Sequence, residues 1–379
     1  MKIIKKDIEE YIYNLEGEYD EDSIVSSLYS IYEIDIDQNR SNLYVINHLV
    51  KDILNYKRKM ETIYNDRRDK LNNLKLLEMP EQRSEEWYEM RKKRLTASSL
   101  AAAIGKCHFT SRDELILSKI EDKPYESNPI TEWGVKYEDV AIMFYEELYN
   151  VKILDFGLVP HPDFEAFGAS PDGICDDTGN LDYIGRMVEI KCPPKRKFTK
   201  TVPEHYKLQV LGQLEVCDLD ECDFFQVKVE EYENIEEYIN DYFEIENQLI
   251  DGRTHLNYPK SVTMTYIDDG KLSYEYAPLN LSIPEIQAWI EDKQKKNMGR
   301  VHEVKFWKIT RYECTLVKRD KLWWSNIIDS ILNFYNDMLH YKTDNNVEIL
   351  KSRIKDSKTR KKKVEPLEEH QLISDEEDN

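Results

Sequence analysis

The sequence lacks any long apolar run. Forty per cent of its 379 residues are hydrophobic, but they are dispersed, and no run approaches the roughly 20 residues that a membrane-spanning helix needs. The first residues, from Met1 to Asp7, hold three lysines and one aspartate and contain no apolar signal-peptide core. With 34% charged residues, the composition indicates an intracellular protein without a membrane partner.

Cysteine pairs of the kind that bind metal are also missing. None of the six cysteines forms a C-x-x-C pair, and no C-x-x-C motif is followed by paired histidines. This pattern excludes the usual structural zinc sites and iron–sulfur clusters. Scattered cysteines in an intracellular chain of this length are typical of reduced residues in a core.

The chain has no excess of positive charge. Its formal net charge of −21 argues against nucleic acid as a partner if the total alone is considered. The acidic residues, however, are concentrated in residues 7–37, 230–248 and 365–378, whereas residues 83–106 and 191–200 are rich in lysine and arginine. These two basic segments are where a DNA backbone could lie, and an acidic remainder would repel DNA from other faces.

Turn residues and hydrophobic periodicity divide the chain into three parts. Residues 1–78 are predicted to form a helical N-terminal extension with a long amphipathic helix between Ile46 and Leu74. Residues 79–345, after Met79-Pro80, are predicted to form the main domain, in which 230–303 are an insertion. Residues 346–379 form a charged tail that is predicted to be disordered, and its basic run from Lys358 to Lys363 resembles a nuclear-localisation signal.

The main domain is predicted to alternate helices and strands. Helices are expected from Ser84, from the hydroxyl-rich Thr96–Leu100, at 134–149, at 204–217 and at 323–341. Strands are expected at 151–159, 186–191, 223–229 and 304–318. The insertion is predicted to contain an acidic helix near 232–250, a hairpin at 262–276 and a helix near 283–295.

One pair of segments carries a chemical signature. Ser170-Pro171-Asp172-Gly173 supplies one carboxylate, and a strand further on supplies Glu189 and Lys191. Alternation along that strand puts Glu189 and Lys191 on one face and the side chain of Ile190 in the core, while the Ile190 carbonyl stays available as an oxygen ligand. Two carboxylates suit Mg²⁺, which activates water beside a phosphate, and a lysine offsets developing negative charge.

A surface ion pair is the alternative interpretation of Glu-x-Lys, because this motif alone is common. Its combination with the upstream Asp172 turn and the following Cys192-Pro193-Pro194 favours a site. The sequence leaves open whether one metal ion or two would bind.

Several motifs in order resemble the PD-(D/E)xK nuclease superfamily, and within it the phage lambda-type exonucleases, also called YqaJ-type viral recombinases. The resemblance covers about residues 80–230 and 304–342. It rests on the Asp172 and Glu189–Lys191 segments and on four others: Trp87–Arg91 with Leu95–Ser98, Trp133–Glu138, Tyr206–Val210, and Val317–Asp320 with the tryptophan-rich helix after it. It implies an α+β fold with a restriction-endonuclease-like core, in which a central mixed sheet is flanked by helices and carries an inserted α/β subdomain.

The resemblance also implies roles for individual residues. Asp172, Glu189 and the Ile190 carbonyl would bind Mg²⁺ or, in its place, Mn²⁺, and Lys191 would be catalytic. Glu138 would lie in the same cleft, and Gln209 would position the nucleophile or the phosphate. Arg91 and Ser98 would hold a terminal 5′-phosphate, since an arginine fork and a helix N-terminus both favour anions.

Each of these residues also has an ordinary structural interpretation. Arg91 lies in a basic run that is typical of a solvated patch, and Ser98 is typical of a helix cap. Glu138 and Gln209 are common residue types on helix surfaces.

The function implied is hydrolysis of one strand of linear duplex DNA, from the 5′ towards the 3′ end, which leaves 3′ single strands for recombination or repair. Family members form a toroidal homo-trimer, so double-stranded DNA ends, a single-strand annealing protein and further copies of the chain are the expected partners. A viral source would place the protein in the host cytoplasm, a viral factory or the nucleus. The alternatives are an endonuclease or nickase of the same superfamily, and a catalytically silent DNA-binding or structural protein.

Overall fold

The computed structural model describes residues 5–15, 20–31, 40–121, 128–195, 197–268, 270–343 and 346–364. The chain divides into two compact units, Met1–Asn72 and Asn73–Asn379, so the division falls slightly before the predicted boundary at residue 78. None of the described helices is long and apolar enough to cross a membrane.

The first unit is helical. It contains α1 (Lys5–Tyr13), α2 (Glu21–Ile31) and most of α3 (Arg40–Lys75), which includes the long helix predicted between Ile46 and Leu74. Ile8 and Ile12 are one turn apart on α1 and pack with apolar residues of α2 and α3, among them Leu28, Val50 and Ile53. This unit therefore has a hydrophobic core of its own.

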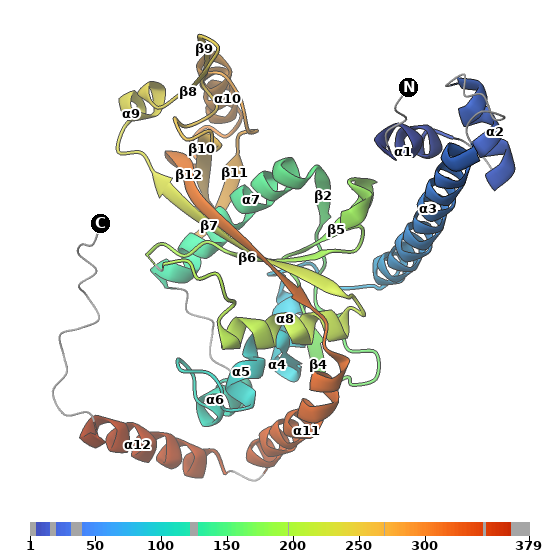
Figure 1. The fold of residues 1–379 in the computed structure, drawn as a ribbon. Helices are drawn as coiled ribbons and strands as arrows, with labels where there is room; N and C mark the ends of the chain where they lie inside the picture. The colour runs from blue at the N-terminus through green and yellow to red at the C-terminus, as the bar shows by residue number, and fades with distance from the viewer. Residues whose placement is uncertain are drawn as a thin grey trace. The chain divides into compact units, whose positions relative to one another are not determined.

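A seven-stranded mixed sheet forms the centre of the second unit (Figure 1). Its strand order is β11-β10-β12-β7-β6-β5-β2, and only the β6–β7 pair is parallel. The strands are β2 (Val151–Leu154), β5 (Gly173–Gly179), β6 (Met187–Lys191), β7 (Glu221–Glu231), β10 (Lys260–Asp268), β11 (Lys271–Tyr276) and β12 (Val301–Lys318). The predicted mixed sheet flanked by helices is confirmed.

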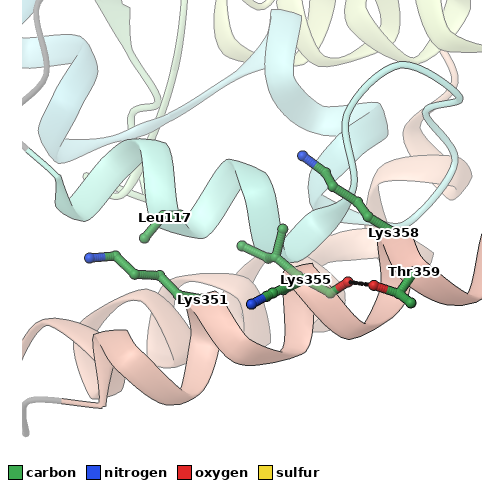
Figure 2. Close-up of a pocket in the computed structure, with 6 residues that line it drawn as sticks. Leu117, Lys351, Lys355, Lys358 and Thr359 are labelled. Atoms are coloured by element: carbon green, nitrogen blue, oxygen red, sulfur yellow. Dashed lines mark hydrogen bonds between the residues drawn. The ribbon is translucent and has the colours of Figure 1, made fainter.

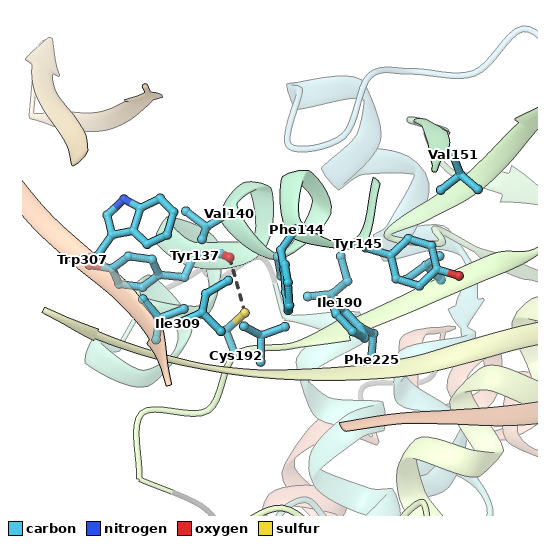
Figure 3. Packing of buried hydrophobic residues seen from close by; sticks show 14 of the residues in the cluster. Tyr137, Val140, Phe144, Tyr145, Val151, Ile190, Cys192, Phe225, Trp307 and Ile309 are labelled. Atoms are coloured by element: carbon cyan, nitrogen blue, oxygen red, sulfur yellow. Dashed lines mark hydrogen bonds between the residues drawn. The ribbon is translucent and has the colours of Figure 1, made fainter. Parts of the chain in front are cut away.

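Helices α7 (Pro129–Tyr149) and α8 (Glu204–Val216) cover opposite faces of the sheet around β6. Figure 3 shows the face under α7, where Val188 and Ile190 of β6 belong to the same buried cluster as Phe144 of α7. Because side chains alternate along a strand, Glu189 and Lys191 face α8. The core on one face of β6 thus determines which residues project from the other.

The second unit also contains a small three-stranded sheet. It is formed by β1 (Leu95–Thr96), β4 (Phe167–Ala169) and β3 (Val159–Pro160). Its strand β1 contacts α4 (Glu85–Lys93) and α5 (Leu100–Ala103), and these two helices contact α6 (Arg112–Ile120). Ser84 caps α4, as the sequence predicted, by accepting a hydrogen bond from the Trp87 amide. The predicted single strand at 151–159 is wrong, because β2 and β3 belong to different sheets.

A helix does begin within Thr96–Leu100, but the hydroxyl cap predicted for it is wrong. Thr96 is part of β1, where it is paired with Gly168, and a single 3₁₀ turn over Ala97–Ser99 follows before the four-residue α5. Neither Thr96 nor Ser99 caps a helix with its side chain. The Thr96 hydroxyl lies instead 3.2 Å from the Ser98 hydroxyl.

The inserted residues continue the main sheet. β12 pairs with β7 over its C-terminal half and with β10 over its N-terminal half, so one strand spans both parts. The acidic helix predicted near 232–250 is limited to α9 (Ile235–Asn240), and the hairpin of β8 (Phe243–Ile245) and β9 (Gln248–Ile250) follows. Glu246 and Asn247 have positive φ angles, which interrupt any helix at this point. The predicted hairpin and second helix are confirmed as β10–β11 and α10 (Ile283–Lys296).

Two helices end the described chain: α11 (Lys321–Thr343), which was predicted, and α12 (Val347–Val364). The prediction of disorder from residue 346 is wrong for α12, which packs on α6 through the fully buried Leu350 and the ion pairs Arg353–Asp113 and Lys358–Glu114. Local composition missed these contacts because the partners lie more than 200 residues earlier in the sequence. The rest of the predicted tail, residues 365–379, lies outside the described residues.

Candidate active site

Glu189 of β6 is the centre of the site. Its side chain is 0% exposed, yet both carboxylate oxygens have partners. Gln209 and Gln213 of α8 donate side-chain amide hydrogen bonds to Oε1 and Oε2, each at 2.7 Å, and Lys191 forms an ion pair with Oε1. A buried carboxylate is tolerated when it is paired and hydrogen-bonded in this way.

Asp172 lies in the turn before β5 and contacts β6. Its Oδ2 accepts a hydrogen bond of 2.7 Å from the backbone amide of Ile190, which fixes the carboxylate beside the strand that carries Glu189 and Lys191. Burial, and then the negative charge of Glu189, raise the pKa of Asp172 well above its usual value. A positive charge in addition to that of Lys191 would therefore stabilise the ionised form of Asp172.

Lys191 is held among acidic groups. Burial acts to lower the pKa of Lys191, but attraction by Glu189 and Asp172 outweighs burial and raises this pKa. The ammonium also lies 5.2 Å from the ring centre of Tyr206 on α8. Lys191 is thus a permanent cation with a fixed position.

Glu138 of α7 faces the same region from the other side of β6. Burial raises its pKa, while the charges of Arg83 and Lys191 act to lower it. Arg83 forms an ion pair of 3.0 Å with Glu138 and has a positive φ of 67°. Glu138, Arg83 and Asp172 line a cavity of about 240 Å³ together with Asp139 and Asp155.

Arg91 and Ser98 are close together, as the predicted phosphate pocket requires. An Arg91 guanidinium nitrogen donates a hydrogen bond of 3.1 Å to the Ser98 hydroxyl, and the guanidinium stacks 4.3 Å from the Trp87 ring centre. The Trp87 indole in turn donates to the Ser170 hydroxyl at 3.0 Å, two residues before Asp172. A continuous chain of contacts therefore links Arg91 to the Asp172 turn.

Sequence reasoning missed two residues of this site. Gln213 follows Gln209 by four positions, and this spacing puts both on one face of α8, so a helical projection would have found it. Arg83 has no such signal, because its contact with Glu138 depends on a left-handed backbone conformation that the sequence around it does not require.

The donor chemistry fits a hard divalent cation. Asp172 and Glu189 offer carboxylate oxygens, and the Ile190 carbonyl lies between them on the chain; Mg²⁺ typically uses one or two carboxylates and keeps several waters. Burial and then repulsion by Glu189 raise the pKa of Asp172, and a bound cation would offset both effects by stabilising the carboxylate. Among the described residues, no group of three or more histidine, cysteine or acidic side chains is arranged to hold an ion.

Residues 86–220 match the model of one family, the YqaJ-like viral recombinase domain. Over this segment the chain is similar to YqaJ-like viral recombinases. The segment contains every residue that the sequence predicted for the site, from Arg91 to Gln209, and also Gln213. Arg83, all of β7, the insertion and the C-terminal helices lie outside the matched segment.

Known proteins that resemble the chain beyond this domain include a viral protein and two bacterial nucleases. An uncharacterized protein of Acanthamoeba polyphaga mimivirus is 28% identical over 315 residues, which are 74% of this chain but 57% of the relative. The chain thus spans less than two thirds of that relative's length. An alkaline exonuclease from Laribacter hongkongensis is 19% identical, with a TM-score of 0.40, over 72% of this chain and 99% of that one. A phage-related exonuclease from Haemophilus somnus is 13% identical, with a TM-score of 0.33, over 68% and 96%.

Proposed function

We propose that the protein is a metal-dependent DNA exonuclease that hydrolyses one strand of linear duplex DNA. The observation that carries this proposal is the junction of Asp172 with β6. The Ile190 amide holds the Asp172 carboxylate beside the Glu189–Lys191 pair, within the segment that is similar to YqaJ-like viral recombinases. Two buried carboxylates and a fixed lysine are the groups that metal-assisted phosphodiester hydrolysis requires.

Each side chain has a role in this chemistry. Asp172, Glu189 and the Ile190 carbonyl would hold Mg²⁺ or Mn²⁺. The bound ion would polarise the scissile phosphate and lower the pKa of an attacking water. Lys191, which stays protonated, orients that water and stabilises negative charge that develops on the phosphate oxygens. Gln209 and Gln213 keep the Glu189 carboxylate in position, and Glu138 adds a further acidic group beside the site.

The direction of hydrolysis is proposed to be 5′ to 3′. Arg91 supplies a planar donor that binds phosphate bidentately, and Ser98 adds a hydroxyl next to it. A pocket of this kind selects a terminal 5′-phosphate, so that the opposite strand remains as a 3′ single strand for recombination or repair. Duplex DNA ends are the proposed substrate, inside a cell or an infected cell, with a single-strand annealing protein and a homo-trimer as proposed assemblies.

The test uses three DNA substrates of one sequence: a linear duplex with 5′-phosphates, the same duplex with 5′-hydroxyls, and a covalently closed circle. With Mg²⁺, the protein should degrade the phosphorylated ends fastest and leave the circle intact. Arg91→Ala should reduce this preference for phosphate, whereas Lys106→Ala, a nearby cation paired with Glu204, should not.

Two results would change the proposal. Cleavage of the closed circle at the rate of the linear duplex would replace it with an endonuclease or nickase. Binding of DNA without cleavage in either Mg²⁺ or Mn²⁺ would replace it with a non-catalytic DNA-binding protein.

A further inference from the structure

A second cavity, of about 480 Å³, lies between α4, α6 and α11. It shares no lining residue with the cavity beside Glu138 and Asp172. Its rim contains five cations: Lys92, Lys93, Arg94, Lys119 and Lys342. Four of its eleven lining residues belong to α11, which lies outside the segment 86–220 that matches the family model.

The charge around this cavity is strongly positive in a chain whose net charge is −21. Glu165 is the single acidic residue of its lining, and its side chain is 92% exposed where it meets Arg94 at 3.5 Å. Lys92 also contacts Glu89 at 2.9 Å on the helix surface. Exposed pairs of this kind are weak, so they do not cancel the attraction that five cations exert on an anion.

Two of the cations have buried donor groups. The Lys119 ammonium donates to the backbone carbonyls of Arg91 and Arg94, at 2.6 and 2.8 Å, where α4 ends. Burial, with the charge of Arg91, lowers the pKa of Lys119 to about 7. The Nε of Arg94 is buried and has no hydrogen-bond partner within the described part of the chain. An anion in the cavity would stabilise the charged form of Lys119 and offer an acceptor to Arg94.

The rest of the lining is apolar and partly aromatic. Met338 is buried, and Tyr335 and Leu339 of α11 adjoin it. A cationic rim over an apolar floor suits a ligand that joins an anionic group to a flat hydrophobic one. A nucleotide has this construction, because its phosphate binds cations and its base stacks on aromatic or apolar side chains.

A neighbouring lysine-rich cavity differs in its charge balance. Figure 2 shows it between α6 and α12, with a volume of about 370 Å³ and with Lys351, Lys355 and Lys358 in its wall. Glu121 lies 3.2 Å from Lys351, and Glu114 lies 2.7 Å from Lys358. Two of its three lysines are thus paired with half-buried carboxylates that also hold α12 in place, which makes it the weaker anion site.

We propose that the cavity between α4, α6 and α11 binds a nucleotide of single-stranded DNA, apart from the site of hydrolysis. This inference deepens the proposed function and rests on it, because hydrolysis of one strand of the duplex would leave the other strand single. A contact of this kind would hold the remaining strand on the protein while hydrolysis proceeds.

The test measures binding without metal, so that its result does not depend on hydrolysis. Fluorescence anisotropy of a labelled single strand of about 15 nucleotides in EDTA gives the affinity at several salt concentrations. The double variant Lys93→Glu/Lys342→Glu should bind about 10-fold more weakly, and the slope of log K against log salt should fall by about 1.4. Leu339→Trp, which fills the cavity without a change of charge, should weaken binding but keep the slope.

A matched control is Lys271→Glu/Lys295→Glu, which makes the same change in net charge at two exposed positions outside the cavity lining. This control should bind as the unmodified protein does. An equal loss of affinity in both double variants, or no loss of affinity in either, would overturn the proposed site. Displacement of the strand by polyglutamate of equal length would also overturn it, because the cavity would then accept any polyanion. If the unmodified protein failed to cleave DNA but showed this binding pattern, only the proposed function would fail.

Discussion

At the scale of single residues, Glu189 shows how the site is held. A fully buried carboxylate is costly unless charges and donors surround it, and Lys191, Gln209 and Gln213 supply them. The same contacts fix the direction of the carboxylate oxygens towards α8. Stability and the geometry of the proposed catalytic site therefore depend on the same hydrogen bonds.

Replacement of Gln213 tests this dependence. Gln213→Leu keeps the side-chain volume but removes the donor to Glu189, so the free energy of unfolding should fall by about 1.5–3 kcal/mol, and kcat should also fall. Tyr232→Phe is the control, because it removes a hydrogen bond of 2.7 Å to Asp241, a carboxylate in the inserted part. It should reduce stability and leave kcat unchanged. Urea unfolding and steady-state kinetics measure both; equal kcat values in the two variants would contradict this role.

The Arg83–Glu138 pair predicts a change in pH dependence. Burial raises the pKa of Glu138, and Arg83 is the strongest charge that opposes this rise. In Arg83→Met the pKa should therefore rise further, so that Glu138 ionises only at higher pH. If ionised Glu138 is needed, the acidic limb of the kcat profile should move to higher pH, and Arg83→Lys should restore it. An acidic limb that does not move in Arg83→Met would show that Glu138 is not the titrating group.

Residues of the site differ in how far the sequence could predict them. Alternation along β6 was enough to predict that Glu189 and Lys191 project together and that Ile190 is buried. The spacing of Gln209 and Gln213 contained the same kind of information. The contact of Arg83 did not, because it joins a loop to a helix 55 positions later through an uncommon backbone angle.

At the scale of elements, periodicity was reliable wherever one face of an element is buried. β6, β7, α8 and α11 lie close to their predicted bounds because each has an apolar face against the core. The acidic segment at 232–250 and the basic α12 lack a strong pattern of their own. Their structures depend on partners that are distant in the sequence, such as the carboxylates of α6 that bind α12. Local sequence patterns do not contain these contacts.

Helix α12 should detach when its ion pairs with α6 are weakened. The Glu114 carboxylate accepts hydrogen bonds from Lys358 and Ser111, and these lower its pKa to about 2, from an ordinary value of 4.5. A lowered carboxyl pKa adds stability that is present above pH 4.5 and is lost as the pH falls towards 2. At neutral pH, Glu114→Gln removes the same charge, so hydrogen exchange of residues 347–364 should become faster.

Asp292→Asn is the matched control for α12, because it removes an acidic residue that pairs with Lys296 at 2.8 Å on α10. Exchange of α12 should be unaffected in this variant. If residues 347–364 also exchanged slowly in Glu114→Gln, then Leu350 and the remaining ion pairs would hold α12 in place without Glu114.

At the scale of the whole molecule, the two compact units have separate cores, and the site lies entirely in the second. A chain that begins at Asn73 should therefore fold and show the proposed nuclease activity on short duplexes. Circular dichroism melting and the end-labelled assay check this prediction. A truncated chain that is soluble and folded but inactive would show that residues before Asn73 contribute to catalysis.

The most direct test of the account is the single-turnover rate of Lys191→Met on a 5′-phosphorylated linear duplex with Mg²⁺. The lysine carries a fixed positive charge beside the two proposed metal ligands, so its loss should slow hydrolysis by about 10²–10³-fold while DNA still binds. Lys195→Met, which changes an exposed lysine just beyond β6, should keep the normal rate. Equal rates for Lys191→Met and the unmodified protein would contradict the assignment of this site.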